Sequence, residues 1–210
     1  MELHEIIPKT EVQACFSTPL AVEEYDFSET HRIIATDPGN VHATAMNVWN
    51  RIVQYKLKPV NPGAIGPWVD AKDPKIFKQI ERLIGQPVLT DAAYYSANLA
   101  DREVAKILLF RVFPNSLHLA DVFFRNPAAP LPPAQRRTYR IHKGLGLLPT
   151  VFARMRAYAA EQGIEFLTLT AAAGDLVPLF RKHGFEIEDN DVARFCATTD
   201  QCIPMELKIQ

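Results

Sequence analysis

A basic segment with two glycines, in the C-terminal half of the chain, has the residue types of a phosphate site. It runs from Arg140 to Gly146 and contains His142, Lys143 and Gly144. The glycines let the backbone turn tightly, and the first N–H groups of a following helix have no partner within that helix. These donors, the helix dipole and the basic side chains together favour a phosphate, and a pyrophosphate would suit the segment.

On this motif alone, a tight turn with a basic rim is the better interpretation. A P-loop is excluded because the Gly-Lys-Ser/Thr ending is absent. A dinucleotide-binding fingerprint needs a third glycine, and Pro149 stands at that position. The order of helices and strands around the turn is therefore needed to distinguish a phosphate-binding turn from a plain tight turn.

Hydrophobic periodicity predicts the elements that position this turn. Strands are expected at Thr30–Thr36, Glu103–Phe113, Leu117–Phe124, Ile164–Thr170, Phe185–Glu188 and Ile203–Ile209. Helices are expected after Asp37–Asn40, from Asp73 to Gly85, over Gly144–Gln162 and over Asp175–His183. Glu103–Phe113 and Leu117–Phe124 read as an antiparallel hairpin because Pro114-Asn115-Ser116 has turn chemistry. This order predicts an α/β (α+β) chain with a mixed, mostly antiparallel sheet and helices on both faces.

The first 29 residues and one later segment fit this pattern less clearly. Glu2–Ile7 and Val12–Phe16 read as short strands, and residues 1–29 are expected to form an N-terminal extension to a domain at 30–210. The segment Asn126–Tyr139 contains four prolines, at 127, 130, 132 and 133, which exclude a helix or a central strand. It is expected to be a loop, either a mobile insert or a lid over a binding site.

Two sequence motifs stand out in the C-terminal third, the glycine turn and the end of a later short helix. The glycine turn begins a long helix, the strand Ile164–Thr170 follows, and a short helix then ends in Leu179-Phe180-Arg181-Lys182-His183-Gly184-Phe185. This order, over Tyr139–Glu188, resembles the GNAT superfamily of acyl-CoA-dependent N-acyltransferases. Residues 30–124 are compatible with that family in order but carry no diagnostic residues.

The resemblance implies that the turn binds the pyrophosphate of acetyl-CoA, or of another acyl-CoA, through backbone amides. The binding residues that it implies are Arg140, His142, Lys143, Gly144, Leu145, Gly146 and Phe180. The reaction it implies is transfer of an acetyl or other short acyl group to an amine of a small molecule or a protein. The identity of that amine stays open.

The chain departs from the family pattern at three places. Ile141 stands where the family usually has Arg or Gln. Phe180 replaces the tyrosine that often protonates the leaving thiolate, and Ala171–Ala173 replaces a segment that commonly holds an asparagine. These changes keep open a second hypothesis, a catalytically inactive GNAT-like domain that binds CoA or a protein partner.

Candidate bases for the amine proton lie on the expected strand Leu117–Phe124, which is usually the floor of the family's acceptor site. His118 and Asp121 are three residues apart, so a regular strand would place them on opposite faces. Asp121 lies nearer the strand's end, where a cleft would open, and is the better candidate. The structural alternatives are a solvent contact for Asp121 and a hydrogen-bonded sheet histidine for His118.

Composition narrows the class of protein. The chain has 210 residues, 48% of them hydrophobic and 22% charged, which predicts a folded domain. A net charge of −1 gives no basic field for nucleic acid, and no apolar run reaches the roughly 20 residues that span a bilayer. Three cysteines without ligand spacing predict no metal site. A cytoplasmic enzyme is expected, with an acyl-CoA and an amine as partners and a homodimer left open.

Overall fold

A single mixed sheet runs through the structure, a computed structural model that describes residues 1–70, 75–137 and 141–209. The seven strands lie in the order β1-β2-β3-β4-β5-β7-β6. They are β1 (Ala21–Asp26), β2 (Leu89–Leu99), β3 (Arg102–Val112), β4 (Ser116–Phe124), β5 (Phe166–Ala173), β6 (Glu186–Ile187) and β7 (Gln201–Lys208). Among the strands that the structure describes, β4 and β5 alone pair in parallel. The predicted mixed, mostly antiparallel sheet is confirmed.

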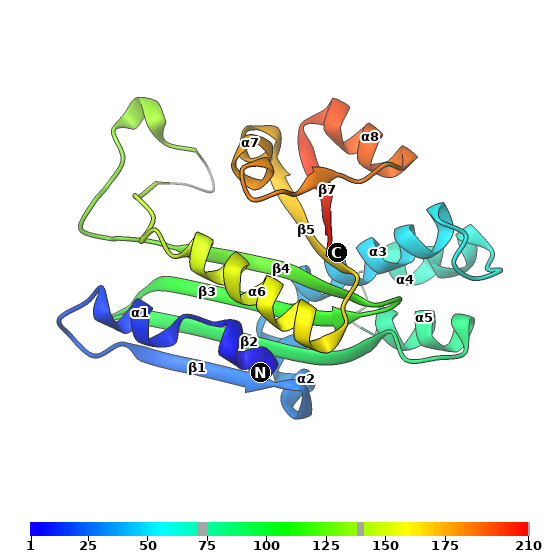
Figure 1. Ribbon diagram of the computed structural model, residues 1–210, viewed down its shortest axis with the longest axis horizontal. Helices are drawn as coiled ribbons and strands as arrows, with labels where there is room; N and C mark the ends of the chain where they lie inside the picture. Colours follow the sequence, from blue (N-terminus) through cyan, green and yellow to red (C-terminus); the bar gives the residue numbers. More distant parts are fainter. Residues whose placement is uncertain (71–74, 138–140, 210) are drawn as a thin grey trace.

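Helices cover both faces of the sheet (Figure 1). On one face α6 (Leu148–Gln162) and α1 (Lys9–Ala14) pack with the N-terminal 3-10 turn. On the other face lie α2 (Thr30–Thr36), α3 (Pro38–Gln54), α4 (Gly66–Asp70) and α5 (Ile76–Ile84). The C-terminal third adds α7 (Val177–Arg181) and α8 (Asp191–Thr199). Short 3-10 turns occur at Leu3–Ile6, Phe27–Glu29, Pro62–Ile65, Pro133–Gln135 and Gly174–Leu176.

Several local signals act as the sequence predicts. The carboxylate of Asp37 caps α3 by accepting a 3.3 Å hydrogen bond from the backbone N–H of Asn40. Gly85 ends α5 and Gly163 ends α6, both in the left-handed conformation that glycine adopts without strain. The hairpin β3–β4 and strands β5 and β7 are also confirmed. The expected start of α5 at Asp73-Pro74 lies outside the described residues.

Other predictions of secondary structure are wrong, because packing in the folded protein decides elements that the local sequence leaves ambiguous. Thr30–Thr36 is the helix α2, and Glu2–Ile7 and Val12–Phe16 contain helical turns and coil, because short apolar runs fit either period. Strand β2 was not among the expected strands. Burial between two neighbouring strands makes it a strand nonetheless.

Residues 1–29 belong to the same folded unit as the rest of the chain. Leu3, Ile6 and Val12 are buried in the hydrophobic cluster that α6 covers. Strand β1 pairs with β2 along its whole length. The expected boundary near residue 30 therefore does not coincide with an end of the core.

The pairing of β4 with β5 is short, and this opens the sheet. It spans Ser116–Leu119 on β4 and Phe166–Leu169 on β5. Beyond these residues, β4 still pairs with β3 as far as Phe124, and β5 still pairs with β7 as far as Ala173. The two strands thus part in the middle of the sheet, which confirms the expectation of neighbouring strands that splay.

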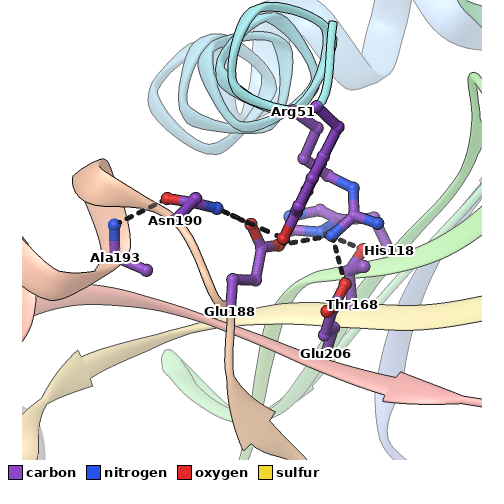
Figure 2. Close-up of polar contacts among 8 residues, drawn as sticks. Arg51, His118, Thr168, Glu188, Asn190, Ala193 and Glu206 are labelled. Carbon is purple, nitrogen blue, oxygen red and sulfur yellow. Dashed lines mark hydrogen bonds and ion pairs between the residues drawn. The ribbon is translucent and has the colours of Figure 1, made fainter. Parts of the chain in front are cut away.

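A buried ionic cluster joins α3 to the C-terminal side of this opening (Figure 2). Nη1 of Arg51 lies 2.7 Å from Oε1 of Glu188 and 2.7 Å from Oε2 of Glu206. Arg51 and Glu188 are 4% and 2% exposed, so the pair is fully desolvated. Burial raises the pKa of Glu188, although Arg51 opposes this. The cluster joins α3 to β7 and to the residue after β6, and removing one partner would be destabilising because it would leave an uncompensated buried charge.

Candidate active site

A cleft of about 630 Å³ lies where β4 and β5 part. One wall is the end of β4, at residues 121–125, and the opposite side is formed by α7. The turn at residues 144–149 forms its floor together with the start of α6. A volume of this size is typical of sites for extended small molecules.

The glycine turn has the free backbone donors that the sequence predicts. Within the described residues, the N–H groups of Gly144, Leu145, Gly146 and Leu147 donate to no protein acceptor. Gly146 has a φ of +77°, and a Cβ on Gly144 would lie 3.4 Å from the carbonyl oxygen of Phe124. Helix α6 begins at Leu148, not at Gly144 as expected, so the turn is longer. A row of unpaired N–H groups in a cleft wall is suited to phosphate oxygens.

The Pro-rich segment holds this turn in place. The backbone of Lys143 donates to the carbonyl of Ala129 at 2.9 Å and accepts from the N–H of Asn126 at 2.8 Å. His142 lines the cleft, and its buried Nδ1 has no partner in the part of the chain that the structure describes. The described part of the Pro-rich segment thus fixes the position of the glycine turn through backbone hydrogen bonds. Arg140, a predicted binding residue, lies outside the described residues.

Phe180 lies on the cleft wall and is also part of the core. Its ring packs edge-on against Phe152, with centroids 6.2 Å apart, and it is 7% exposed. Leu179 of α7 also lines the cleft, together with Leu176 before the helix and His183 after it. Burial, with a smaller contribution from Arg156, lowers the pKa of His183, so the imidazole is neutral at neutral pH.

The expectation that His118 and Asp121 lie on opposite faces is wrong. His118 pairs with Phe110 and Asp121 pairs with Leu108, and these two partners lie in the same core cluster. The register shifts between them because Ala120 is an extra residue on β4. Such a bulge changes the alternation, so both side chains point towards the α3 face.

Only Asp121 of this pair lines the cleft. His118 is 3% exposed, and its Nδ1 lies 3.0 Å from Oγ1 of Thr168 (Figure 2). Burial, together with the charge of Arg51, lowers the pKa of His118 to about 3. The structural alternative, a hydrogen-bonded sheet histidine, describes this residue well.

Asp121 sits in a polar cluster with two partners. Its Oδ2 accepts a 3.1 Å hydrogen bond from Nδ2 of Asn40 and lies 3.0 Å from Nζ of Lys106. The same lysine forms an ion pair with Asp37. Sequence reasoning missed Asn40 and Lys106, because no local pattern links α3, β3 and β4 at these positions.

The described residues contain no group of three or more His, Cys, Asp or Glu side chains placed to hold a metal ion. Among these residues there is also no helix with the length and apolarity to cross a bilayer.

No profile of a protein family matches the chain, and no curated protein sequence matches it. Solved structures with a similar fold include the PaiA N-acetyltransferase of Thermoplasma acidophilum in complex with coenzyme A. It is 15% identical, with 90% of this chain and 99% of that chain covered and a TM-score of 0.35.

Two further structures cover nearly all of both chains. A GNAT-family acetyltransferase of Staphylococcus aureus Mu50 is 12% identical over 91% of this chain and 100% of its own, with a TM-score of 0.38. An acetyltransferase of Streptococcus agalactiae is 14% identical over 91% and 98%, with a TM-score of 0.36. Because one fold can host many reactions, the reaction has to come from the residues of the cleft. These three solved acetyltransferases, one of them of the GNAT family, are similar to this chain over about nine tenths of its length.

Proposed function

We propose that this protein is an N-acyltransferase that moves an acetyl or other short acyl group from acyl-CoA to an amine. The observation that carries the proposal is the row of free N–H groups from Gly144 to Leu147, set in a cleft between two splayed strands. A pyrophosphate matches the donors, and the cleft continues from them along β4. An extended ligand with a charged end and a long amide-bearing arm fits this arrangement.

The end of β4 supplies groups for such an arm. Past Leu119 the strand has no β5 partner, so alternate backbone N–H and C=O groups on that edge are free to pair with amides of a ligand. The apolar side chains of Val122 and Phe180 line the same cleft and would exclude water from it. Lys143 lies next to the glycine turn with an exposed side chain and would contact phosphate oxygens.

Acyl-CoA would supply the activated carbonyl as a thioester. An amine attacks it only when neutral, so a nearby base is useful, and we assign that role to Asp121. Asp121 lines the cleft and its side chain is 28% exposed, whereas His118 is buried and bonded to Thr168. Asp121 would hold the amine next to the carbonyl and take up its proton.

No side-chain acid stands at Phe180. A thiolate of the CoA type is a fairly good leaving group, so its departure does not require one. The second candidate function, a CoA-binding domain without catalysis, is favoured by this same residue. Phe180 packs against Phe152 and Phe185 as an ordinary core aromatic.

The two functions are separated by two measurements on the full chain. Calorimetric titration with acetyl-CoA tests the cleft, and a thiol-release assay with a panel of amines tests the reaction. Binding together with amine-dependent thiol release supports the enzyme. Binding without release for every amine supports the second function, and absence of binding contradicts both.

A further inference from the structure

We propose that Lys106 and Asn40 are positioning residues that hold the carboxylate of Asp121 in the orientation in which it receives the acceptor's proton. This inference rests on the proposed function, since it concerns the base of that reaction. It goes further by assigning a role to β3 and to the first turn of α3, neither of which lines the cleft.

Both contacts of the Asp121 carboxylate are made by the same oxygen atom. Nδ2 of Asn40 and Nζ of Lys106 both contact Oδ2 of Asp121, at 3.1 and 3.0 Å. Oδ1 of Asp121 has no partner among the residues that the structure describes. Two donors on one oxygen fix the plane of the group and leave the other oxygen for a ligand in the cleft. A single contact would leave the side chain free to rotate.

The donors are themselves held by Asp37, the capping residue of α3. Its Oδ2 accepts a 3.0 Å hydrogen bond from Asn40 and forms an ion pair with Lys106. Asp37 and Lys106 have side chains that are 10% and 15% exposed, so both are largely withdrawn from water. The cap of α3 and the base on β4 thus share the same two donors.

The charges in this cluster assign distinct roles to its members. Burial lowers the pKa of Lys106, but the two carboxylates outweigh it and raise that pKa, so the lysine stays an ammonium and cannot itself be the base. Asp37 compensates the charge of Lys106. Asp121 is therefore the member of the cluster that lines the cleft and can receive the proton of an approaching amine.

The test is a double-mutant cycle on kcat in the thiol-release assay, with Lys106→Met, Asp121→Asn and the pair combined. We expect Lys106→Met to lower kcat by roughly ten- to a hundred-fold, no more than Asp121→Asn does, with little change in KM for acetyl-CoA. In the Asp121→Asn background the same lysine change should have almost no effect on kcat, because the group it positions is gone. Lys106→Arg, which keeps the charge, should recover much of the rate.

Two further variants keep the test decisive. Asn40→Ala removes the other donor without removing a charge. If Lys106→Met folds poorly, Asn40→Ala takes its place in the cycle, and its effect on kcat should likewise disappear in the Asp121→Asn background. Lys78→Met, at an exposed site on α5, is the matched control and should change nothing.

The outcomes distinguish the two proposals. Equal losses of kcat in both Asp121 backgrounds would overturn the positioning role and leave the enzyme standing. A wild-type protein that binds acetyl-CoA but releases no thiol with any amine would overturn both.

Discussion

The carboxylate of Asp121 accepts a hydrogen bond of 3.1 Å from the side-chain amide of Asn40, which lies 81 residues earlier in the chain. This contact joins the first turn of α3 to the point where β4 leaves β5. It puts a held carboxylate on the wall of the cleft, and the predictions below begin from it.

Replacing Asp121 by asparagine should remove the base but keep the size of the side chain. We expect kcat for amine acylation to fall by roughly a hundred-fold, within the usual range for general base catalysis. The dissociation constant for acetyl-CoA, measured by calorimetry, should stay unchanged because the donors that we propose for the pyrophosphate lie on the glycine turn and not on β4. A variant with wild-type kcat below the pKa of the amine would remove Asp121 from the mechanism.

Replacing Gly146 by valine should weaken acetyl-CoA binding. Gly146 has a φ of +77°, and a branched side chain would strain the turn and block the approach of a phosphate. Gly163→Val is the matched control, since Gly163 has a φ of +63° at the other end of α6 and also has open space around it. Both variants should lose roughly 1–2 kcal/mol of stability, from the left-handed conformation.

Only Gly146→Val should lose affinity for acetyl-CoA, by at least about ten-fold. The readouts are urea unfolding for stability and calorimetry for binding. Equal affinity of the two variants would contradict the assignment of the turn.

Installing a hydroxyl at Phe180 should preserve or raise the rate. Phe180→Tyr adds an acid on the cleft wall, while the ring keeps its contacts with Phe152 and Phe185. The gain should be smaller than the roughly hundred-fold typical of general acid catalysis, because the thiolate already leaves readily. The measurement is kcat across pH, with the unfolding temperature as a check on the fold. A large fall in kcat in a stable variant would show that the ring's position, not its chemistry, is what the cleft needs.

The buried His118 should make the protein sensitive to mild acid. Its pKa in the folded state is lowered to about 3 from 6.5, so as the pH falls through 6.5 the unfolded chain takes up a proton first. The stability that His118 contributes is present above pH 6.5 and is lost as the pH falls. At about pH 5.5 the loss amounts to about 1 kcal/mol.

His118→Asn lacks this titration and can still hydrogen-bond to Thr168. Urea unfolding above pH 6.5 and at about pH 5.5 should therefore show a smaller loss of unfolding free energy on acidification in the variant than in the wild type. The same loss in both proteins would mean that His118 is not the source.

Much of the cleft could be predicted from the sequence because it depends on local chemistry. Gly144 and Gly146 favour a tight turn whose backbone N–H groups are free, through their own conformational freedom. Asp37 caps α3 through a contact with Asn40, three residues away. The hairpin β3–β4 and the apolar stripe of α6 are likewise set by spacing along the chain.

The tertiary structure decided which side chains meet. Regular alternation would separate His118 from Asp121, but the extra residue at Ala120 arises from the pairing of β4 with β3, and it turns both to one face. The strand-like run Thr30–Thr36 became a helix, and residues 1–29 joined the core, because the burial available in the assembled sheet outweighs weak local preferences. Asn40 and Lys106 reach Asp121 only after α3, β3 and β4 pack together, so their shared role follows from packing and not from any pattern along the chain.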